Sequence, residues 1–340
     1  MSRKSFLVML VLLACLGVLP LLQSAYALRL GTLACMYAVM AVSWTVIGGF
    51  AGYPSFGTAA FFGMGAYTGG ILLGKGAGLV VAVSAAGLLA MAFALLLGMV
   101  LLRLKGHYFA VASLAVAEVL RELTNTATDL TGGGTGLNIA LGTIDAGQGV
   151  LAQASFFFWA MWAMLVLTFV VVRWVEVSKL GFGLACIRQN EPAADMIGVN
   201  ATIYKSVAFG ISGVFVAMAG ALYGAWVNYI EPPDVFDVLY SIKPIVMALL
   251  GGVGSPAGAV LGAFAFLGIE ELVWRNFLQI HTGVLGLLVV LLLLFLPRGL
   301  MTLTQAFKPR RRATQEVQVG APRRTAPSKL APQAKPKVLQ

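Results

Sequence analysis

Residues 181 to 199 read Gly-Phe-Gly-Leu-Ala-Cys-Ile-Arg-Gln-Asn-Glu-Pro-Ala-Ala-Asp-Met-Ile-Gly-Val and form a polar island between two long apolar halves of the chain. Asn190 can cap a short helix, Pro192 is tolerated in its first turn, and Gly198 can adopt the left-handed conformation that ends it. Such a helix has about two turns and a length of roughly 10 Å. Because a helix this short is not stable alone, we expect other structure to hold it in place.

One face of this stretch is apolar. Residue spacings of three, seven and three place an apolar stripe on one side of it, formed by Leu184, Ile187, Ala194 and Ile197. We expect this stripe to face a partner. We expect the charged side chains of Arg188, Glu191 and Asp195 to stay in contact with solvent.

Composition identifies the chain as an integral membrane protein. Hydrophobic residues make up 59% of its 340 residues and charged residues only 11%. A soluble protein of this length carries about a quarter charged residues. Membrane-spanning strands alternate apolar and polar residues over segments of about ten residues, and the sequence lacks that pattern. We therefore expect an all-α polytopic membrane protein.

The basic charge of the chain is concentrated in its last residues. Residues 307–340 hold nine Lys or Arg and one Glu, which accounts for +8 of the net charge of +10. Their content of Pro, Lys, Arg, Ala and Gln predicts a disordered tail. Such a tail indicates a cytoplasmic terminus near anionic lipid rather than nucleic-acid binding. The expected organisation is a transmembrane domain over residues 1–306, followed by this tail.

Apolar segments predict a bundle of about ten transmembrane helices. They lie near residues 6–22, 28–47, 56–74, 78–102, 108–124, 153–174, 205–229, 238–255, 257–275 and 282–300. A helix needs about 20 residues to cross a hydrocarbon core of about 30 Å, so several segments are marginal and are expected to be short, broken or re-entrant. This leaves a range of about eight to ten spans.

The placement of basic residues predicts the orientation. If ten segments cross the membrane, the N-terminus, Arg103 with Lys105, the loop 173–205 and the tail all fall on one side. The positive-inside rule makes that side cytoplasmic, so we expect both termini there. Residues 25–27 (Ala-Tyr-Ala) also fit a signal-peptidase site. Because the preceding apolar run is longer than a signal core, we favour an uncleaved first helix.

Small residues recur at helical spacing in two segments and predict close helix packing. Gly65 and Gly69 share one face of the segment 56–74. In the segment 205–229 a spacing of four residues links Gly213, Ala217 and Ala221, and also Gly220 and Gly224. Small residues at this spacing let the backbones of two membrane helices approach closely.

One candidate for the translocation pathway is the segment that contains Tyr108, Glu118 and Arg121. Glu118 and Arg121 lie three residues apart on one helix face, where opposite charges can pair. Ionisable groups inside a membrane segment are costly, so they should face protein or a water-filled cavity. Two interpretations stay open: this face lines the pathway, or it holds a structural ion pair near the outer surface.

The second candidate for the pathway is the glycine cluster of Gly251, Gly252 and Gly254, which Pro256 follows. Glycine and proline in this arrangement are expected to break a helix. The break would free backbone N–H and C=O groups, as in the cores of many transporters near their pathway.

The sequence predicts no cofactor, no metal site and no nucleotide site. The potential metal ligands are scattered along the chain, namely Cys15, Cys35, Cys186, His107 and His281. Residues 69–76 nearly spell a phosphate-binding loop, but Gly76 replaces the Ser or Thr that binds Mg²⁺, and a membrane helix replaces the required strand. We therefore do not expect an enzyme, and any ATP hydrolysis must occur on a separate chain.

Five motifs in order give the chain a family resemblance. The first lies in the loop 181–199 and has the order Gly181, Arg188, Asn190, Glu191, Ala193, Ala194 and Gly198. The other motifs lie at residues 48–70, 104–121, 241–258 and 296–300. Together they resemble the branched-chain amino-acid permeases of the LivM type, which are subunits of bacterial ABC importers. The chain departs from the family pattern at Thr58, where His is usual, and at Lys243, where Glu is usual.

The resemblance implies a permease of the cell inner membrane that carries leucine, isoleucine or valine. It implies four kinds of partner: two ATP-binding cassette subunits, a second homologous permease, a periplasmic solute-binding protein and the amino-acid substrate. In this family the loop helix sits in a groove of the ATPase subunit, which implies an ATPase-coupling role for the seven residues of the loop motif.

Two other classes of transporter are consistent with parts of the sequence. A related permease for urea, short amides or another small polar solute would share the coupling loop. An ion-coupled secondary carrier would need no ATPase partner, and the absence of an obvious relay of acids or histidines counts against it.

Overall fold

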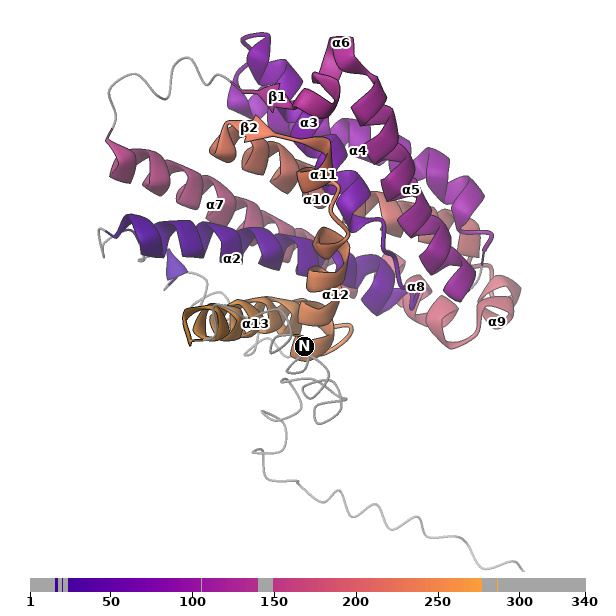
Figure 1. The fold of residues 1–340 in the computed structure, drawn as a ribbon. Coiled ribbons are helices and arrows are strands. Elements are labelled where there is room, and N and C mark those ends of the chain that lie inside the picture. Colours follow the sequence, from indigo (N-terminus) through magenta and orange to yellow (C-terminus); the bar gives the residue numbers. More distant parts are fainter. Residues whose placement is uncertain are drawn as a thin grey trace, which may run out of the picture.

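The computed structural model describes residues 16, 17, 20, 24–104, 106–139, 149–276 and 286 (Figure 1). Its elements, labelled as in Figure 1, are α2 (Ala25–Trp44), the π-helix η2 (Thr45–Phe50), α3 (Thr58–Gly74), α4 (Leu79–Leu101), α5 (His107–Thr126), α6 (Thr128–Thr131), the 3₁₀-helix η3 (Gly133–Thr135), β1 (Leu137–Asn138), α7 (Val150–Val177), α8 (Lys179–Gln189), α9 (Glu191–Met196), α10 (Ala201–Val227), β2 (Tyr229–Ile230), α11 (Pro232–Val235), α12 (Leu239–Gly251) and α13 (Pro256–Asn276). Apart from isolated positions, the segments 6–22 and 282–300 and the tail 307–340 lie outside the described residues.

The helices follow the apolar segments of the sequence. In the described part of the chain, five helices are long and apolar enough to cross a membrane, namely Ala25–Phe50, Leu79–Leu101, Val150–Val177, Ala201–Val227 and Pro256–Val273. α3 has 17 residues and α12 has 13, which makes both short for a hydrocarbon core of about 30 Å. The structure therefore confirms a helical membrane protein with short and broken segments, and the total of ten spans stays a prediction.

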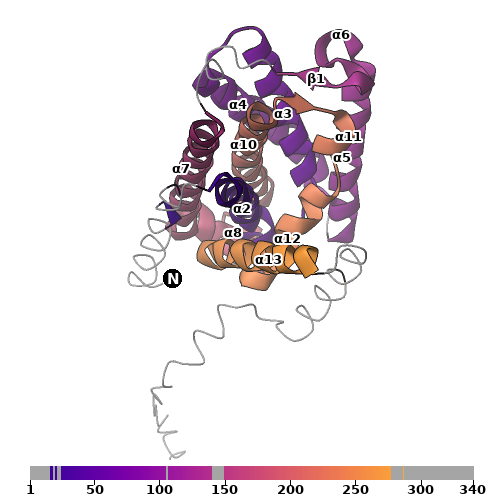
Figure 2. The same ribbon diagram turned by 60° about the vertical axis from the view of Figure 1, so that its left-hand side comes forward.

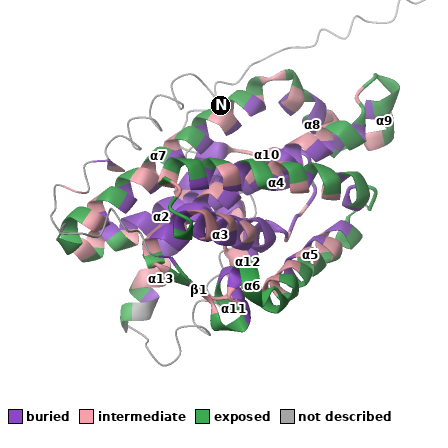
Figure 3. Ribbon diagram, turned by 90° about the horizontal axis from the view of Figure 1, so that it is seen from above, coloured by how far each residue is buried: buried purple, intermediate pink, exposed green. Residues whose placement is uncertain are grey.

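α2 and η2 form the centre of the bundle. In their most apolar stretch 89% of the residues are buried, against 33% in α4, and Figure 3 shows α2 buried among helices with exposed outer faces. α2 contacts α7, α10, α12 and α13, and Figures 1 and 2 both show it running beside α7. The exposed face of α4 carries the large apolar residues Val80, Leu88, Leu96 and Val100, as expected for a surface in contact with lipid.

Small residues let α3 and α10 pack closely. The spacing predicts the close packing, and the structure identifies the two helices as partners. A Cβ atom added to Gly65 would meet the backbone of Ala217. From the other side, a Cβ atom added to Gly220 would meet the backbone carbonyl of Phe62. The two helices therefore cross at backbone contact, which only small side chains permit.

Replacing Gly65 by Leu is expected to lower the yield and the thermal stability of the purified protein sharply. A side chain at this position would clash with the backbone of Ala217. Because the core is closely packed, the clash can be relieved only if the two helices move apart. Size-exclusion chromatography and thermal unfolding in mild detergent would measure the effect. Gly78→Leu is the matched control, because no atom lies within 4 Å of its Cβ position. Equal stability of the two variants would contradict the close crossing.

The chain between η2 and α3, residues 51–57, is not helical, although most of its residues are buried. Side chains from distant helices pair with the backbone of Phe56 in this segment. The amide of Phe56 donates to Ser113 Oγ at 2.9 Å, and Ser241 Oγ donates to the carbonyl of Phe56 at 2.5 Å. Ser241 Oγ also accepts from the amide of Ala59 at 2.9 Å. A buried irregular backbone is tolerated only where protein or water meets its polar groups in this way.

A second break separates α12 from α13, as the glycine cluster predicts. α12 ends at Gly251 and α13 begins at Pro256. Between them Gly252 and Gly254 have φ values of 122° and 84°, which side chains other than glycine rarely adopt. A Cβ atom on Gly251 would meet the backbone of Gly258, so α12 and α13 pack closely on either side of the break.

A short antiparallel ladder joins two loops that are far apart in sequence. β1 pairs with β2, with Leu137 opposite Ile230 and Asn138 opposite Tyr229. The sequence did not predict this pairing, because two residues on each strand are too few for an alternating pattern. The ladder ties the segment after α5 to the segment after α10.

Candidate functional site

The loop between α7 and α10 folds as two helices, α8 and α9, and α9 has the caps that the sequence predicts. Asn190 Oδ1 accepts from the amide of Ala193 at 3.1 Å and caps the N-terminus. At the other end Gly198 has a φ of 85°. The amide of Val199 donates to the carbonyl of Ala194 at 3.0 Å, which is the pattern of a Schellman C-cap.

The apolar stripe that we expected to face a partner is mostly buried inside this chain. Leu184, Ile187 and Ala194 are 0%, 4% and 2% exposed, whereas Ile197 is 67% exposed. α8 packs on α7, α10 and η2. The prediction is therefore wrong for three of the four residues. The reason is that apolar spacing identifies a face that will be buried, but not the chain that buries it.

Glu191 is not in free contact with solvent, as we had expected, but is held by two side chains of the membrane domain. Its side chain is 19% exposed. Its Oε1 accepts from Lys205 Nζ at 2.7 Å and its Oε2 accepts from the hydroxyl of Tyr53 at 2.6 Å. Asp195 is exposed, as predicted, and its Oδ1 accepts from the amide of Ala201 at 3.3 Å.

Lys205 lies at the centre of this arrangement and is only 1% exposed. An ammonium group has three N–H donors, and Lys205 Nζ has three acceptors. They are Glu191 Oε1 at 2.7 Å, the hydroxyl of Tyr53 at 3.1 Å and the carbonyl of Leu102 at 3.1 Å. Leu102 is the C-cap of α4, where unpaired carbonyls favour a positive charge. We call Lys205, Glu191, Tyr53 and the Leu102 carbonyl the buried charge cluster. It joins α9, α10, the end of α4 and the non-helical segment 51–57.

Tyr53 acts as a donor in the buried charge cluster. Burial raises the pKa of its hydroxyl well above the ordinary value, and the hydrogen bond to Glu191 and the charge of Glu191 raise it further. The hydroxyl therefore stays protonated at neutral pH. It can donate to Glu191 while it accepts from Lys205.

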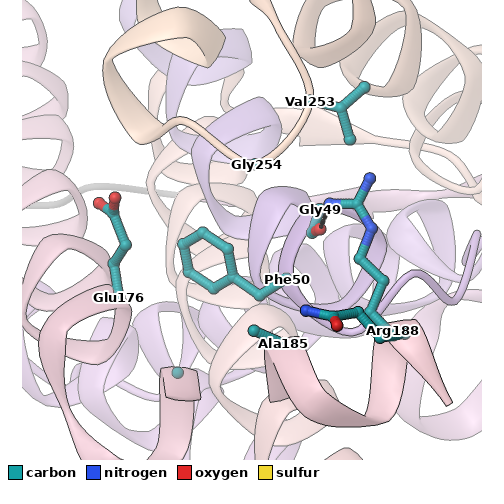
Figure 4. Close-up of a pocket in the computed structure, with 9 residues that line it drawn as sticks. Gly49, Phe50, Glu176, Ala185, Arg188, Val253 and Gly254 are labelled. Carbon is teal, nitrogen blue, oxygen red and sulfur yellow. Dashed lines mark hydrogen bonds between the residues drawn. The ribbon is translucent and has the colours of Figure 1, made fainter. Parts of the chain in front are cut away.

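A second contact ties α8 to the core. Arg188 Nη1 donates to the carbonyl of Gly49 in η2 at 2.7 Å. Gly49 in turn lies against the α12–α13 break, because a Cβ atom on it would sit 3.1 Å from Cα of Gly254. Beside these residues is a cavity of about 480 Å³, which Gly181, Arg188 and Gly254 help to line (Figure 4). The structure thus brings two predicted coupling residues next to one predicted pathway residue.

The two candidate pathway groups lie in different places. Tyr108 is 78% exposed on α5, and Glu118 pairs with Arg121 on the same helix. The groove that Glu118 lines, between α5 and residues 236–238, includes none of the glycine cluster, and the cavity beside Gly254 includes no residue of α5. Within the described residues, the ion pair is confirmed, but it is not joined to the glycine cluster.

The sequence patterns do not single out Tyr53, Lys205 and Gly49 as parts of the site. Lys205 opens an apolar segment, where it reads as one more basic residue of a cytoplasmic loop. Tyr53 is separated from Glu191 by 138 residues. One signal was available: an ionisable side chain in a membrane segment needs a partner, and Glu191 is only 14 residues away from Lys205.

Comparison with known proteins gives a family match over most of the chain. The family model described as "Branched-chain amino acid transport system / permease component" matches residues 26–296. The high-affinity branched-chain amino acid transport system permease protein LivM of Escherichia coli K12 is 29% identical over 327 residues, which is 89% of this chain and 76% of that protein. The LivM protein of Salmonella typhimurium is 28% identical over the same shares.

A second kind of relative matches a smaller part. The permease protein LivH of Escherichia coli K12 is 30% identical over 141 residues, which is 41% of this chain and 44% of that protein. No solved structure matches the chain. Since the family model spans almost the whole described membrane part, the chain belongs to the family of branched-chain amino acid transport system permease components.

Proposed function

We propose that this chain is the permease subunit of an ATP-driven importer that carries leucine, isoleucine and valine across the cell inner membrane. Family membership and the names of the LivM relatives support the substrate class. Hydrolysis takes place on two ATP-binding cassette subunits, and a periplasmic solute-binding protein delivers the amino acid. The similarity to both LivM and LivH supports a second, homologous permease as the other half of the pathway.

The proposed orientation places α8, α9 and both termini in the cytoplasm. The distribution of basic residues supports it, because Arg103, the loop 173–205 and the tail 307–340 then lie on the cytoplasmic side. Residues 1–306 form the permease domain in this proposal. The β1–β2 ladder then faces the periplasm, where the binding protein docks.

We assign the contact with the ATPase to α8 and α9. The observation that carries this assignment is an exposed apolar surface backed by buried charges. Phe182, Met196 and Ile197 are 70%, 83% and 67% exposed, and apolar side chains on a soluble surface mark an interaction site. The buried charge cluster anchors the same helix, α9, to three parts of the membrane domain.

Within this assignment each residue of the loop motif has a physical role. Asn190 and Gly198 shape the two ends of α9, and Ala193 and Ala194 form its body. The remaining three, Gly181, Arg188 and Glu191, hold the two helices against the core: Gly181 by close packing on the end of α7, Arg188 through Gly49, and Glu191 through Lys205.

The proposed mechanism is a shift between outward-open and inward-open states. Closure of the ATPase subunits moves α9, and the buried charge cluster passes that movement to the segment 51–57 and to the end of α4. Arg188 passes it to η2 beside the α12–α13 break. A partner can select a state only by interacting differently with the two states, and broken helices are elements that can rearrange. Tyr108, Glu118, Arg121 and the glycine cluster stay candidates for the pathway.

Affinity purification with a variant of α9 tests the assignment. Met196→Asp is expected to reduce the amount of ATPase subunit that co-purifies with the tagged permease, because it places a charge in an apolar contact. Met196→Leu is the matched control and should retain the subunit. Equal recovery with both variants would contradict the assignment. Uptake of labelled leucine and of urea by the complete importer separates the amino-acid permease from a permease for small amides.

A further inference from the structure

The cavity beside the α12–α13 break is built from four elements (Figure 4). η2 contributes Gly49 and Phe50, the end of α7 contributes Glu176, α8 contributes several residues that include Ala185 and Arg188, and the turn after α12 contributes Val253 and Gly254. Its volume of about 480 Å³ falls within the range of about 300–1,000 Å³ that is usual for small-molecule sites.

Opposite charges stand on opposite sides of this cavity. Figure 4 shows Arg188 on one side and Glu176 on the other, with the ring of Phe50 between them. Arg188 uses Nη1 for the carbonyl of Gly49, but a guanidinium group has five N–H donors and prefers carboxylates. Glu176 pairs with Arg173 at 2.7 Å, and the two oxygens of a carboxylate can accept about four hydrogen bonds. The charges therefore suit a ligand that carries both a carboxylate and an ammonium group.

The rest of the lining is apolar or lacks side chains. Phe50, Ala185 and Val253 offer hydrocarbon surface, and Gly49 and Gly254 leave the backbone open to the cavity. An α-amino acid carries its two charges on adjacent groups and its side chain on the carbon between them. A short aliphatic side chain would lie against Phe50 and Val253 while the charged groups reach Arg188 and Glu176.

We propose that this cavity binds a free α-amino acid with a short aliphatic side chain on the side of the membrane where α8 and α9 lie. The proposal rests on the proposed function, which makes that side cytoplasmic and makes the ligand the imported product. The bound amino acid connects α7 and α8 with η2 and the α12–α13 turn. It therefore favours the arrangement in which α8 contacts these elements and opposes the rearrangement needed for the next cycle. The site makes the importer sensitive to its own product.

Binding of labelled L-leucine to the purified importer, without its solute-binding protein, tests the proposal. Two unlabelled competitors report on the charges: 4-methylpentanoate lacks the ammonium and 3-methylbutylamine lacks the carboxylate. Each is expected to compete at least about tenfold more weakly than leucine, because it loses one charged hydrogen-bonded contact. Ala185→Trp, which fills the cavity, and Glu176→Gln, which removes the negative charge, should each raise the dissociation constant about tenfold or more. Leu96→Trp adds the same bulk on the exposed face of α4 and should leave it unchanged.

A second measurement places the site on the predicted side. Leucine enclosed in proteoliposomes, on the side of the ATPase subunits, should slow ATP-driven uptake in the wild type and should slow it less in Ala185→Trp. The proposal is overturned if both cavity variants bind leucine with wild-type affinity. It is also overturned if the two analogues compete as well as leucine does. A different result would contradict the proposed function, namely that the wild-type importer takes up no branched-chain amino acid when ATP is supplied.

Discussion

Replacing Lys205 by Met is expected to lower the free energy of unfolding by about 3–5 kcal/mol, the usual cost of removing one partner from a buried ion pair. Methionine fills a similar volume but offers no N–H donor. Glu191, whose side chain is only 19% exposed, and the carbonyl of Leu102 would both lose a partner. The same change should reduce uptake per ATP hydrolysed, because α9 loses its bond to α10.

Thermal unfolding of the purified importer in mild detergent would measure the loss of stability. The ratio of uptake to ATP hydrolysis in proteoliposomes would measure the loss of coupling. Lys179→Met is the matched control, since it makes the same chemical change at an exposed position of α8; surface substitutions of this kind stay within about 0.5 kcal/mol. Adding Glu191→Gln to Lys205→Met should restore part of the lost stability, because the unpaired charge is then gone. If Lys205→Met and Lys179→Met unfold at the same temperature, the buried charge cluster has no structural role.

Replacing Gly198 by Val is expected to leave the protein in the membrane but to uncouple ATP hydrolysis from uptake. Gly198 has a φ of 85°, and a left-handed conformation costs an L-residue roughly 1–2 kcal/mol. No atom lies within 4 Å of its Cβ position, so the effect acts through the backbone rather than through a clash. The strain falls on α9, which has only six residues and little helical stability of its own.

Gly198→Asn separates backbone strain from the loss of glycine itself. Asparagine adopts the left-handed conformation more readily than other side chains, so uptake should stay close to that of the wild type. The measurements are membrane localisation by fractionation, ATPase activity and labelled leucine uptake in proteoliposomes. Normal substrate-stimulated uptake by Gly198→Val would argue against a coupling role for α9.

The predictions that succeeded from the sequence concern features that depend on neighbouring residues. The caps of α9 at Asn190 and Gly198 and the break at the glycine cluster involve contacts within a few positions of the chain. The helix bundle itself follows from apolar segments of sufficient length. Close packing of the segments 56–74 and 205–229 against another helix also followed from the sequence, because small residues at a spacing of four permit close backbone approach.

The sequence by itself therefore determined the membrane-embedded helices, their breaks, the caps of α9 and the family resemblance. The tertiary structure alone decided which side chains meet: Tyr53 with Glu191, Lys205 with the end of α4, and Ser241 with Phe56, which is 185 residues away. It also decided that the chain buries most of the apolar stripe of α8 and α9 itself. The physical reason is that local patterns state which groups must be buried or paired, whereas the identity of the partner depends on how distant helices pack.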